Sequence, residues 1–378
     1  MFNKCSICGS IAEPLEYSFT NSVTSDNRFI NKNISYSYCE NCDYIFIDYD
    51  KRVDLKEFYQ NDYDFLLDND EVEPEIDGVK YSEYLVDFFS EYVKNDNTKS
   101  ILDIGAGKGN LLESFYKKFH DLNYFAVEPS NAFLRLKEKD FIKEKYHCFF
   151  DKDVFRDKRF SYITLVEVLE HVPEPKSFLL SICEVMHADS LLLVEVPNFE
   201  NHKSDLLTAD HLSLFTEFNL TNLFKICGLE VIKKNITNRV PMQFIVKLGN
   251  NMNFDEKNKT MISLALYKEA TKYVEKVIED AISIKNETAA IYGQNVLLDY
   301  LIGNDYLSLS NIECIINDNK LYQGKKKWKG KIDIVGFEEF HKNCQSNNIL
   351  LAMNDCYHDR VTRKLVNKNI YGTLSDRF

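Results

Sequence analysis

Two pairs of cysteines near the start of the chain have the spacing of metal ligands. Each pair follows the C-x-x-C pattern, and thirty residues separate the pairs, which consist of Cys5 with Cys8 and Cys39 with Cys42. Two thiolates in one tight turn reach the same ion at ~2.3 Å, so two such turns complete a tetrahedral zinc site. Because four protein thiolates leave no open position for a substrate, we expect the zinc to be structural.

A glycine-rich turn carries the second candidate chemistry. Residues 101–112 read ILDIGAGKGNLL, so Asp103 ends an apolar run and glycines follow at alternate positions before a helical pattern. Glycine permits positive φ and the close approach of a ligand, and a helix N-terminus presents free N–H groups. A second apolar run ends in Glu128, whose carboxylate can accept both hydroxyls of a ribose. The spacing differs from the dinucleotide pattern G-x-G-x-x-G, and the combination predicts a nucleoside site.

An Asp-His pair supplies candidate acid–base chemistry. Asp210 and His211 lie in the segment 208–215, between a predicted strand and a predicted helix. An imidazole with its ordinary pKa near ~6.5 suits a general base, and we expect His211 to take this role. The alternative is that His211 and Ser213 only cap or orient the helix that follows.

An aromatic cluster upstream of the core is a further candidate. Tyr59, Tyr63 and Phe65 lie in an acidic connection that precedes the first core strand. These rings could wall the substrate pocket, with Tyr63 as a candidate catalytic residue. They could equally fasten the cysteine module to the core.

The elements that must position these residues alternate between strands and helices from residue 99 to about residue 249. We expect strands at Ser100–Ile104, Tyr124–Glu128, Tyr146–Phe150, Tyr162–Glu167, Leu191–Val196, Glu230–Asn235 and Gln243–Leu248. Their apolar character is typical of a sheet covered on both faces, so the pattern predicts a doubly wound α/β core. Ligands of such sheets bind beyond the carboxyl ends of the strands, where Asp103, Glu128 and Glu167 lie. A solvated helix start is the alternative for Glu167 and Glu170.

Helical spacing of apolar residues indicates an amphipathic helix at Tyr81–Val93 and a connecting helix from Thr260 to about Ile284. The last hundred residues predict a second α/β unit, with strands at Ala289–Gly293, Ile312–Asn317, Lys331–Val335 and Ile349–Ala352. The predicted organisation is a zinc-binding module (1–55), a helical and aromatic connection (56–98), the core (99–250), a connecting helix (251–286) and a C-terminal α/β domain (287–378).

The sequence D-I-G-A-G-K-G, the acidic residue ending the second strand and the motif L-E-H-V at residues 169–172 together resemble the class I S-adenosylmethionine-dependent methyltransferases. The resemblance implies a Rossmann-like methyltransferase core. It also implies that Asp103, Gly105, Ala106 and Gly107 border the methionine part of the cofactor, that Glu128 holds the ribose, that Pro129, Phe150 and Asp151 lie near the adenine, and that Glu167 meets cofactor or substrate.

The whole chain is similar to nucleotide-sugar C-methyltransferases, which combine a four-cysteine zinc module, such a core and a Y-H-E-H-F-S-Y-F segment whose last histidine is the proposed base. His211, Ser213 and Phe215 match this segment, and Asp210 replaces its glutamate. Thr208 and Ala209 replace its tyrosine and first histidine. In the C-terminal unit, Gln294-Asn295-Val296 replaces the family's Gly-Ala-x-x-Lys continuation. The lysines near residue 326 could contact phosphates instead, or form a solvated loop.

Composition excludes several classes of protein. The net charge is −13, from 46 basic and 59 acidic residues, which argues against general nucleic-acid binding. The first residues lack an apolar signal core and no run of 18 apolar residues occurs, so we expect a cytoplasmic protein without membrane segments. The sequence gives no indication of the oligomeric state.

Together these patterns predict an enzyme that transfers a methyl group from S-adenosylmethionine to a small polar acceptor, with C-methylation of a nucleotide-linked sugar as the leading candidate. O- or N-methylation of another sugar or small metabolite, in a surface-glycan or natural-product pathway, is the first alternative. A cofactor-binding scaffold without catalysis is the second.

Overall fold

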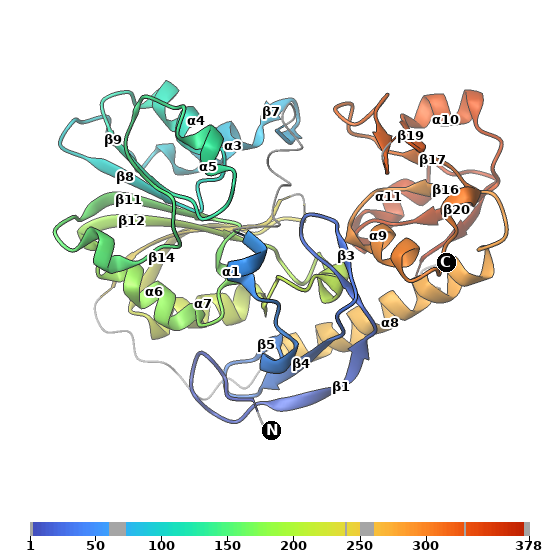
Figure 1. The fold of residues 1–378 in the computed structure, drawn as a ribbon, viewed down its shortest axis with the longest axis horizontal. Coiled ribbons are helices and arrows are strands. Elements are labelled where there is room, and N and C mark those ends of the chain that lie inside the picture. The colour runs from blue at the N-terminus through green and yellow to red at the C-terminus, as the bar shows by residue number, and fades with distance from the viewer. Residues whose placement is uncertain (1–2, 60–72, 239, 250–260, 329, 374–378) are drawn as a thin grey trace.

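A computed structural model describes residues 3–59, 73–238, 240–249, 261–328 and 330–373 of the protein. Within these ranges, three sheets of four or more strands are arranged around one long helix (Figure 1). The core lies on one side, the C-terminal sheet on the other, and the N-terminal strands and the long helix α8 run beneath both in this view.

A seven-stranded sheet forms the core, in the order β10-β9-β8-β11-β12-β15-β14. Strands β8 to β12 pair in parallel, whereas β15 is antiparallel to both of its neighbours. The strands are β8 (Ser100–Ile104), β9 (Asn123–Val127), β10 (Ile142–Tyr146), β11 (Phe160–Val166), β12 (Met186–Val196), β14 (Leu229–Asn235) and β15 (Met242–Leu248). This arrangement confirms the predicted doubly wound α/β core.

Successive residues of the core strands are buried on opposite faces of this sheet. Ile101 packs in one apolar cluster with α3 and α4, whereas Leu102 packs in another with α6 and α7. Figure 1 shows α3, α4 and α5 on one face and α6 and α7 on the other. The helices are α3 (Tyr81–Ser90), α4 (Asn110–Lys118), α5 (Phe133–Leu136), α6 (Pro175–Cys183) and α7 (Glu217–Ile226).

The third predicted core strand was placed wrongly. We expected it at Tyr146–Phe150, but β10 is Ile142–Tyr146 and the chain leaves the sheet after Tyr146. Among the described strands, β10 pairs with β9 alone at the edge of the sheet, and three of its five residues are charged. An edge strand needs no continuous apolar run, so its sequence gives a weak signal.

The N-terminal strands form a four-stranded sheet that includes a short strand whose sequence lies between the core strands β12 and β14. Its order is β1 (Glu13–Phe19), β4 (Ile34–Cys39), β5 (Tyr44–Ile47) and β13 (Ser213–Leu214). In the pairing of β13 with β5, Ser213 lies opposite Phe46 and Leu214 opposite Ile45. Just upstream of β13, the backbone N–H of Ala209 donates to Val23 O at 2.8 Å. Val23 belongs to the hairpin of β2 (Ser22–Val23) and β3 (Phe29–Ile30). The segment predicted to carry the base is therefore fixed by the N-terminal strands.

An acidic side chain from the N-terminal module contacts the first turn of the long helix α8 (Ile262–Ser283). The carboxylate of Asp43, directly after Cys42, accepts the backbone N–H of Ser263 at 3.0 Å, and it also accepts the Tyr38 hydroxyl at 3.0 Å. Asp43 therefore caps a helix 220 residues away in the sequence.

A six-stranded sheet follows α8, in the order β18-β19-β17-β16-β20-β21. One apolar cluster joins one face of this sheet to α8 and to the N-terminal strands, from Tyr36 through Tyr273 to Leu350. The elements are β16 (Ala289–Tyr292), α9 (Val296–Gly303), β17 (Ile312–Ile316), β18 (Lys326–Lys327), β19 (Ile332–Val335), α10 (Phe337–Asn343), β20 (Asn348–Leu351), α11 (His358–Thr362) and β21 (Asn369–Tyr371).

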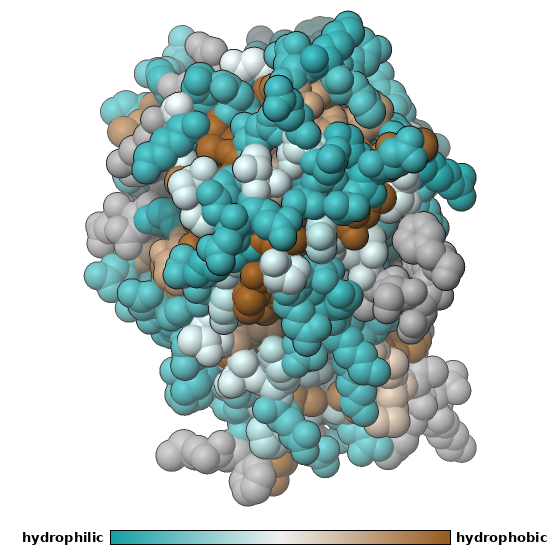
Figure 2. Space-filling model, turned by 90° about the vertical axis from the view of Figure 1, so that its right-hand side faces the viewer, coloured by the Kyte–Doolittle hydropathy of each residue, from teal (hydrophilic) through white to brown (hydrophobic). Residues whose placement is uncertain are grey.

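The remaining short elements precede the core. They are α1 (Leu55–Glu57) and the hairpin of β6 (Glu75–Ile76) and β7 (Val79–Lys80). Figure 2 views the molecule from the side of the C-terminal sheet and shows a mainly hydrophilic face with small, scattered apolar groups. Among the described helices, none combines the length and the hydrophobicity needed to cross a bilayer.

We expect Asp43→Ala to lower the free energy of unfolding by ~2–4 kcal/mol, because it leaves buried donors of Tyr38 and Ser263 without an acceptor. Asp43 also has φ 47°, which strains alanine but is tolerated by asparagine. Asp43→Asn is therefore the matched control and should lose less. Chemical denaturation of both variants measures the difference, and an alanine variant as stable as the wild type would contradict the capping role.

Candidate functional site

The glycine turn follows β8 in a backbone conformation that requires glycine. Gly105, Gly107 and Gly109 have φ of 77°, 53° and 80°. A Cβ on Gly105 would lie 2.4 Å from Val168 Cγ2, and Gly109 is the N-cap of α4. The turn therefore allows no side chain at Gly105 and leads directly into a helix N-terminus.

Glu128 closes the turn from the neighbouring strand. Its carboxylate accepts the backbone N–H of Gly107 at 2.7 Å through one oxygen and that of Ser130 at 2.7 Å through the other. The side chain is buried. Each oxygen keeps a further lone pair, so the carboxylate can accept ligand hydroxyls while it holds the turn in place.

Asp103 lies inside β8 with its side chain beneath the turn. The hydroxyl of Thr164 on β11 donates to Asp103 Oδ1 at 2.7 Å. Burial raises the pKa of Asp103 to about 7, against the effect of this hydrogen bond, and the Glu128 carboxylate adds to the rise. A cation that binds near Asp103 would favour its charged form.

A cleft of about 1470 Å³ opens over this turn. Its lining brings together eight of the nine residues expected to bind cofactor, namely Asp103, Gly105, Ala106, Gly107, Glu128, Pro129, Phe150 and Glu167. The ninth, Asp151, is exposed and does not line the cleft. Its side chain accepts the N–H of Asp153 at 2.9 Å and caps a 3₁₀ helix.

The far end of the cleft is built by the C-terminal sheet. Gln294, Tyr322 and the lysines at 325–327 line it there. Lys326 pairs with Asp333 at 2.9 Å and Lys327 with Asp299 at 2.7 Å. The cleft thus runs from the glycine turn to a group of lysines on the opposite wall.

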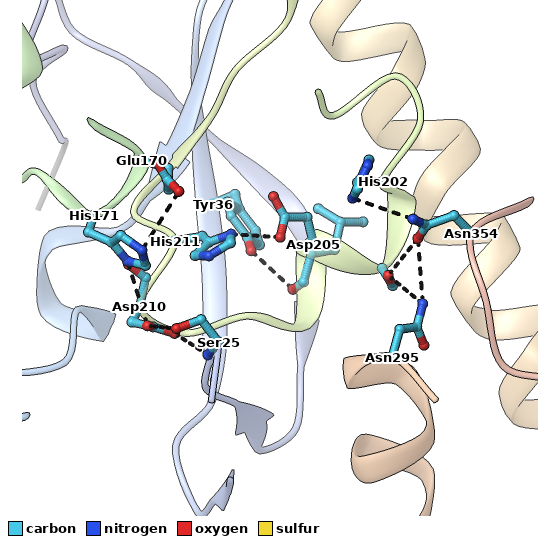
Figure 3. A network of polar contacts seen from close by, with 12 residues as sticks. Ser25, Tyr36, Glu170, His171, His202, Asp205, Asp210, His211, Asn295 and Asn354 are labelled. Carbon is cyan, nitrogen blue, oxygen red and sulfur yellow. Dashed lines mark hydrogen bonds and ion pairs between the residues drawn. The ribbon is translucent and has the colours of Figure 1, made fainter. Parts of the chain in front are cut away.

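His211 is paired with a carboxylate that the sequence did not single out. Its Nδ1 lies 2.7 Å from Asp205 Oδ1, whereas the predicted partner, Asp210, accepts the Ser25 N–H at 2.8 Å and the Ser25 hydroxyl at 2.6 Å (Figure 3). Burial opposes protonation of His211, but the Asp205 carboxylate prevails and raises the pKa to about 10. At neutral pH this imidazole therefore carries a proton, which weakens its case as a base in this state.

The alternative for this segment was that His211 and Ser213 only cap or orient the helix that follows, and the structure shows that neither caps it. Thr216 caps α7 and forms a capping box with Asn219. Ser213 lies in β13, where its hydroxyl is 2.5 Å from the Tyr44 hydroxyl. Asp210 and Ser213 thus direct their side chains toward N-terminal residues, whereas His211 pairs with Asp205.

His171 and Glu170 complete the cluster around His211. His171 lines the cleft, its Nδ1 lies 2.7 Å from the backbone O of Asp210, and its ring centroid is 4.8 Å from that of His211. Burial lowers the pKa of His171 to about 4, so this imidazole is neutral at pH 7. Glu170 is 1% exposed, and burial raises its pKa to about 8.

Glu167 lines the cleft with φ 53° and its side chain is exposed there, whereas Glu170 is buried. Desolvation among the surrounding protein atoms and the neighbouring Glu170 raise the pKa of Glu167 well above its usual range. The burial of Glu170 contradicts the alternative of a solvated helix start for that residue.

Tyr63 and Phe65 lie outside the described residues, but the Tyr59 ring packs edge-on against His171 at 5.7 Å.

The sequence did not reveal Asp205 as the partner of His211. The two residues are brought together because residues 203–207 form a 3₁₀ helix that folds the chain back before β13. A short polar helix of this kind has no apolar periodicity to predict it. The only available signal was the polar character of a segment that turned out to be buried.

The four N-terminal cysteines converge on one point. Their sulfur atoms lie within 4.8 Å of one another, and Cys8 Sγ is 3.6 Å from Cys39 Sγ. Four sulfurs around one zinc at ~2.3 Å would lie about 3.8 Å apart, so the donor set and its spacing fit a tetrahedral ion. Gly9 and Asp43, with φ of 78° and 47°, close the two turns.

Residues 79–234 match the family model described as a methyltransferase domain. The chain is also 29% identical over 128 residues to the ubiquinone biosynthesis O-methyltransferase of Glaesserella parasuis, in a match that covers 28% of this chain and 50% of that protein. The chain therefore spans about half the length of this curated relative.

Among solved structures, the chain is similar to an S-adenosylmethionine-dependent methyltransferase from Clostridium acetobutylicum, with 15% identity, a TM-score of 0.38 and coverage of 50% of this chain and 96% of that one. It is also similar to one from Aquifex aeolicus, with 14% identity, a TM-score of 0.37 and coverage of 44% and 89%. The assignment of residues 79–234 as a methyltransferase domain rests on the match to the family model.

The raised pKa of Asp103 predicts that the free energy of unfolding of the ligand-free protein depends on pH. An aspartate whose pKa is near 4 when unfolded and about 7 when folded binds more protons in the folded state, so stability falls as pH rises between these values. The full effect is on the order of 3–4 kcal/mol. Asp103→Asn keeps an acceptor for Thr164 and does not ionise, so its stability relative to wild type should increase from pH 5 to pH 8.5. Denaturation of both proteins at pH 5 and pH 8.5 measures the difference in their free energies of unfolding. An equal difference at the two pH values would refute the prediction.

Proposed function

We propose that this chain, which carries an S-adenosylmethionine-dependent methyltransferase domain in residues 79–234, transfers a methyl group to a small polar acceptor, and that the acceptor is a nucleotide-linked sugar methylated at carbon. The observation that carries the methyl transfer is the family match over the same residues that form the glycine turn and Glu128. The acceptor class is supported by the size and the lining of the cleft.

The proposed cofactor site is the turn end of the cleft. The cofactor supplies a methyl group activated on a positively charged sulfur. Glu128 would accept the ribose hydroxyls through its remaining lone pairs, while Asp103 would face the positively charged methionine part. Phe150 and Pro129 would flank the adenine. Because methyl transfer is an in-line displacement, the chain contributes chiefly by proximity and orientation.

The rest of the cleft has room for a second molecule. Its volume of about 1470 Å³ exceeds the ~300–1,000 Å³ of a single ligand site. The lysines at 325–327 line its far end, although two of them already pair with aspartates, so a diphosphate there would compete with these pairs. An acceptor with an anionic end would therefore reach from the lysines toward His171.

The acceptor's proton must leave when the new bond forms. The polar groups available on this side of the cleft are Glu167 and His171, backed by Glu170 and His211. We propose that this cluster handles the proton, which extends the role of base that we expected from the sequence for His211 alone. Transfer to an acceptor oxygen or nitrogen would use the same groups.

A second candidate function, O- or N-methylation of another small metabolite, is favoured by one observation. Thr208 and Ala209, which stand where the sugar methyltransferases have tyrosine and histidine, are buried against the N-terminal hairpin and do not line the cleft. Mass spectrometry of products from a panel of nucleotide sugars, followed by location of the methylated atom, separates the two functions.

We expect His211→Asn to lower turnover ~10²-fold or more while leaving the affinity for S-adenosylhomocysteine unchanged, because His211 lies in the acceptor-side cluster. Glu128→Gln is the matched contrast, since it should weaken cofactor binding by removing a charged acceptor from the turn. Calorimetry and single-turnover methyl transfer measure the two effects. A His211→Asn enzyme with full activity would remove His211 from the reaction.

We further propose that the four-cysteine cluster binds one structural zinc ion. The three buried cysteines belong to an apolar cluster that also contains Phe46, Phe215 and residues of α7, so the ion would hold the N-terminal module against the core. Four thiolates would complete its coordination.

Removal of this zinc with a chelator should lower the midpoint of thermal unfolding, since the two turns would lose their common ligand. Cys39→Ser should reduce the bound zinc in the same way, whereas Cys148→Ser, outside the cluster, should not. Elemental analysis with thermal unfolding tests this. Purified protein that contains no zinc and shows disulfides between these cysteines would exclude the proposal.

A further inference from the structure

We propose that Glu170, His171 and His211 form a second metal site, distinct from the four cysteines, which binds a divalent transition-metal ion at the acceptor side of the cleft. One ligand atom from each of the three residues lies within 4.8 Å of the others. The side chains approach one another from two chain segments, 170–171 and 211 (Figure 3). Ligand atoms around an ion at ~2.1 Å lie about 3–4 Å apart, so binding needs side-chain shifts of about 1 Å.

Both histidines are held in the orientation that metal-binding imidazoles adopt. The Nδ1 of His171 is fixed by the backbone O of Asp210 at 2.7 Å, and the Nδ1 of His211 by the Asp205 carboxylate at 2.7 Å. In a metal site, an oxygen partner of this kind orients the ring and makes the other nitrogen a better ligand. Here it leaves Nε2 of each ring to face an ion, which on His211 would displace the proton that this imidazole carries at neutral pH.

Glu170 contributes a buried carboxylate whose hydrogen-bonding capacity is not satisfied by the described residues. Its side chain is 1% exposed, and neither carboxylate oxygen has a hydrogen-bond partner among the described residues. Its Oε1 lies 3.7 Å from His171 Nε2, too far for a hydrogen bond. A buried carboxylate without hydrogen bonds is costly, and a bound cation would satisfy it.

The ligand set indicates the class of ion. Two imidazoles and one carboxylate suit zinc, iron(II), cobalt(II) or manganese(II). The four thiolates of the N-terminal cluster instead favour softer metal ions. Three protein ligands leave at least one position open. Because His171 lines the cleft, that position would be available to an oxygen of the acceptor, so the site deepens the proposed function. Its binding test is independent of methyl transfer.

The test uses the full chain, stripped of metal and reloaded with one equivalent of zinc to fill the cysteine site, and then titrated with Co²⁺. We expect one further equivalent to bind, with visible absorption typical of nitrogen and oxygen ligands and without thiolate-to-cobalt charge transfer. Glu170→Gln and His211→Asn should weaken this binding at least 100-fold. Asp205→Asn, which alters only the support of His211, should weaken it ~10–100-fold.

His202→Asn is the matched control, because His202 lies in the same polar network but contacts Asn354 and is not among the three ligands. It should bind Co²⁺ like the wild type. Thermal unfolding identifies any variant that fails to fold, and the remaining variants then carry the comparison. Absence of a second equivalent in the wild type, or equal affinity in Glu170→Gln and the wild type, overturns the metal site whether or not the protein methylates an acceptor.

Discussion

The pairing of β13 with β5 is the constraint on which the acceptor side of the cleft depends. Two residues of β13 complete the N-terminal sheet, and the residues just before it are tied to Val23 and Ser25. His211 therefore has a fixed position only because the N-terminal module lies against the core. Without this pairing, Asp205, Asp210 and His211 would belong to a long polar loop, and buried charges would have nothing to hold them in place.

The same dependence explains how the cleft acquires two unlike ends. The turn end belongs to β8 and β9 and is held by backbone geometry and by Glu128. The opposite wall comes from the C-terminal sheet, whose position relative to the core is set by α8 and by the apolar cluster shared with the N-terminal strands. Asp103, whose pKa rises on burial, favours a ligand with positive charge at the turn end. S-adenosylmethionine has that charge on its sulfur and loses it with the methyl group, so this end of the cleft would hold the substrate form of the cofactor better than the product form.

Much of the core was predictable from the sequence because its signals are local. Apolar runs marked β8 and β11 well, and the glycine pattern with Glu128 located the turn, since positive φ and a strand-end carboxylate leave direct traces in residue type. β10 was misplaced because a charged edge strand leaves no such trace. The partner of His211 was missed because it depends on a 3₁₀ helix and on a sheet completed from two distant segments. The predicted domain boundaries stay a prediction, since one apolar cluster extends across four of the five units that they separate.

The cap that Asp43 provides for α8 has a consequence for the order of assembly. Asp43 is made early, but its partner Ser263 follows 220 residues later, and Tyr44 must wait 169 residues for Ser213. At a synthesis rate of ~5–20 residues per second, the N-terminal module would stand incomplete for roughly 10–40 seconds after it emerges. Contacts of such long sequence separation also slow folding. The two cysteine turns would thus bind their ion, or remain without it, while the N-terminal sheet still lacks its fourth strand. The module would be complete only after synthesis of α8, the helix that leads to the C-terminal sheet.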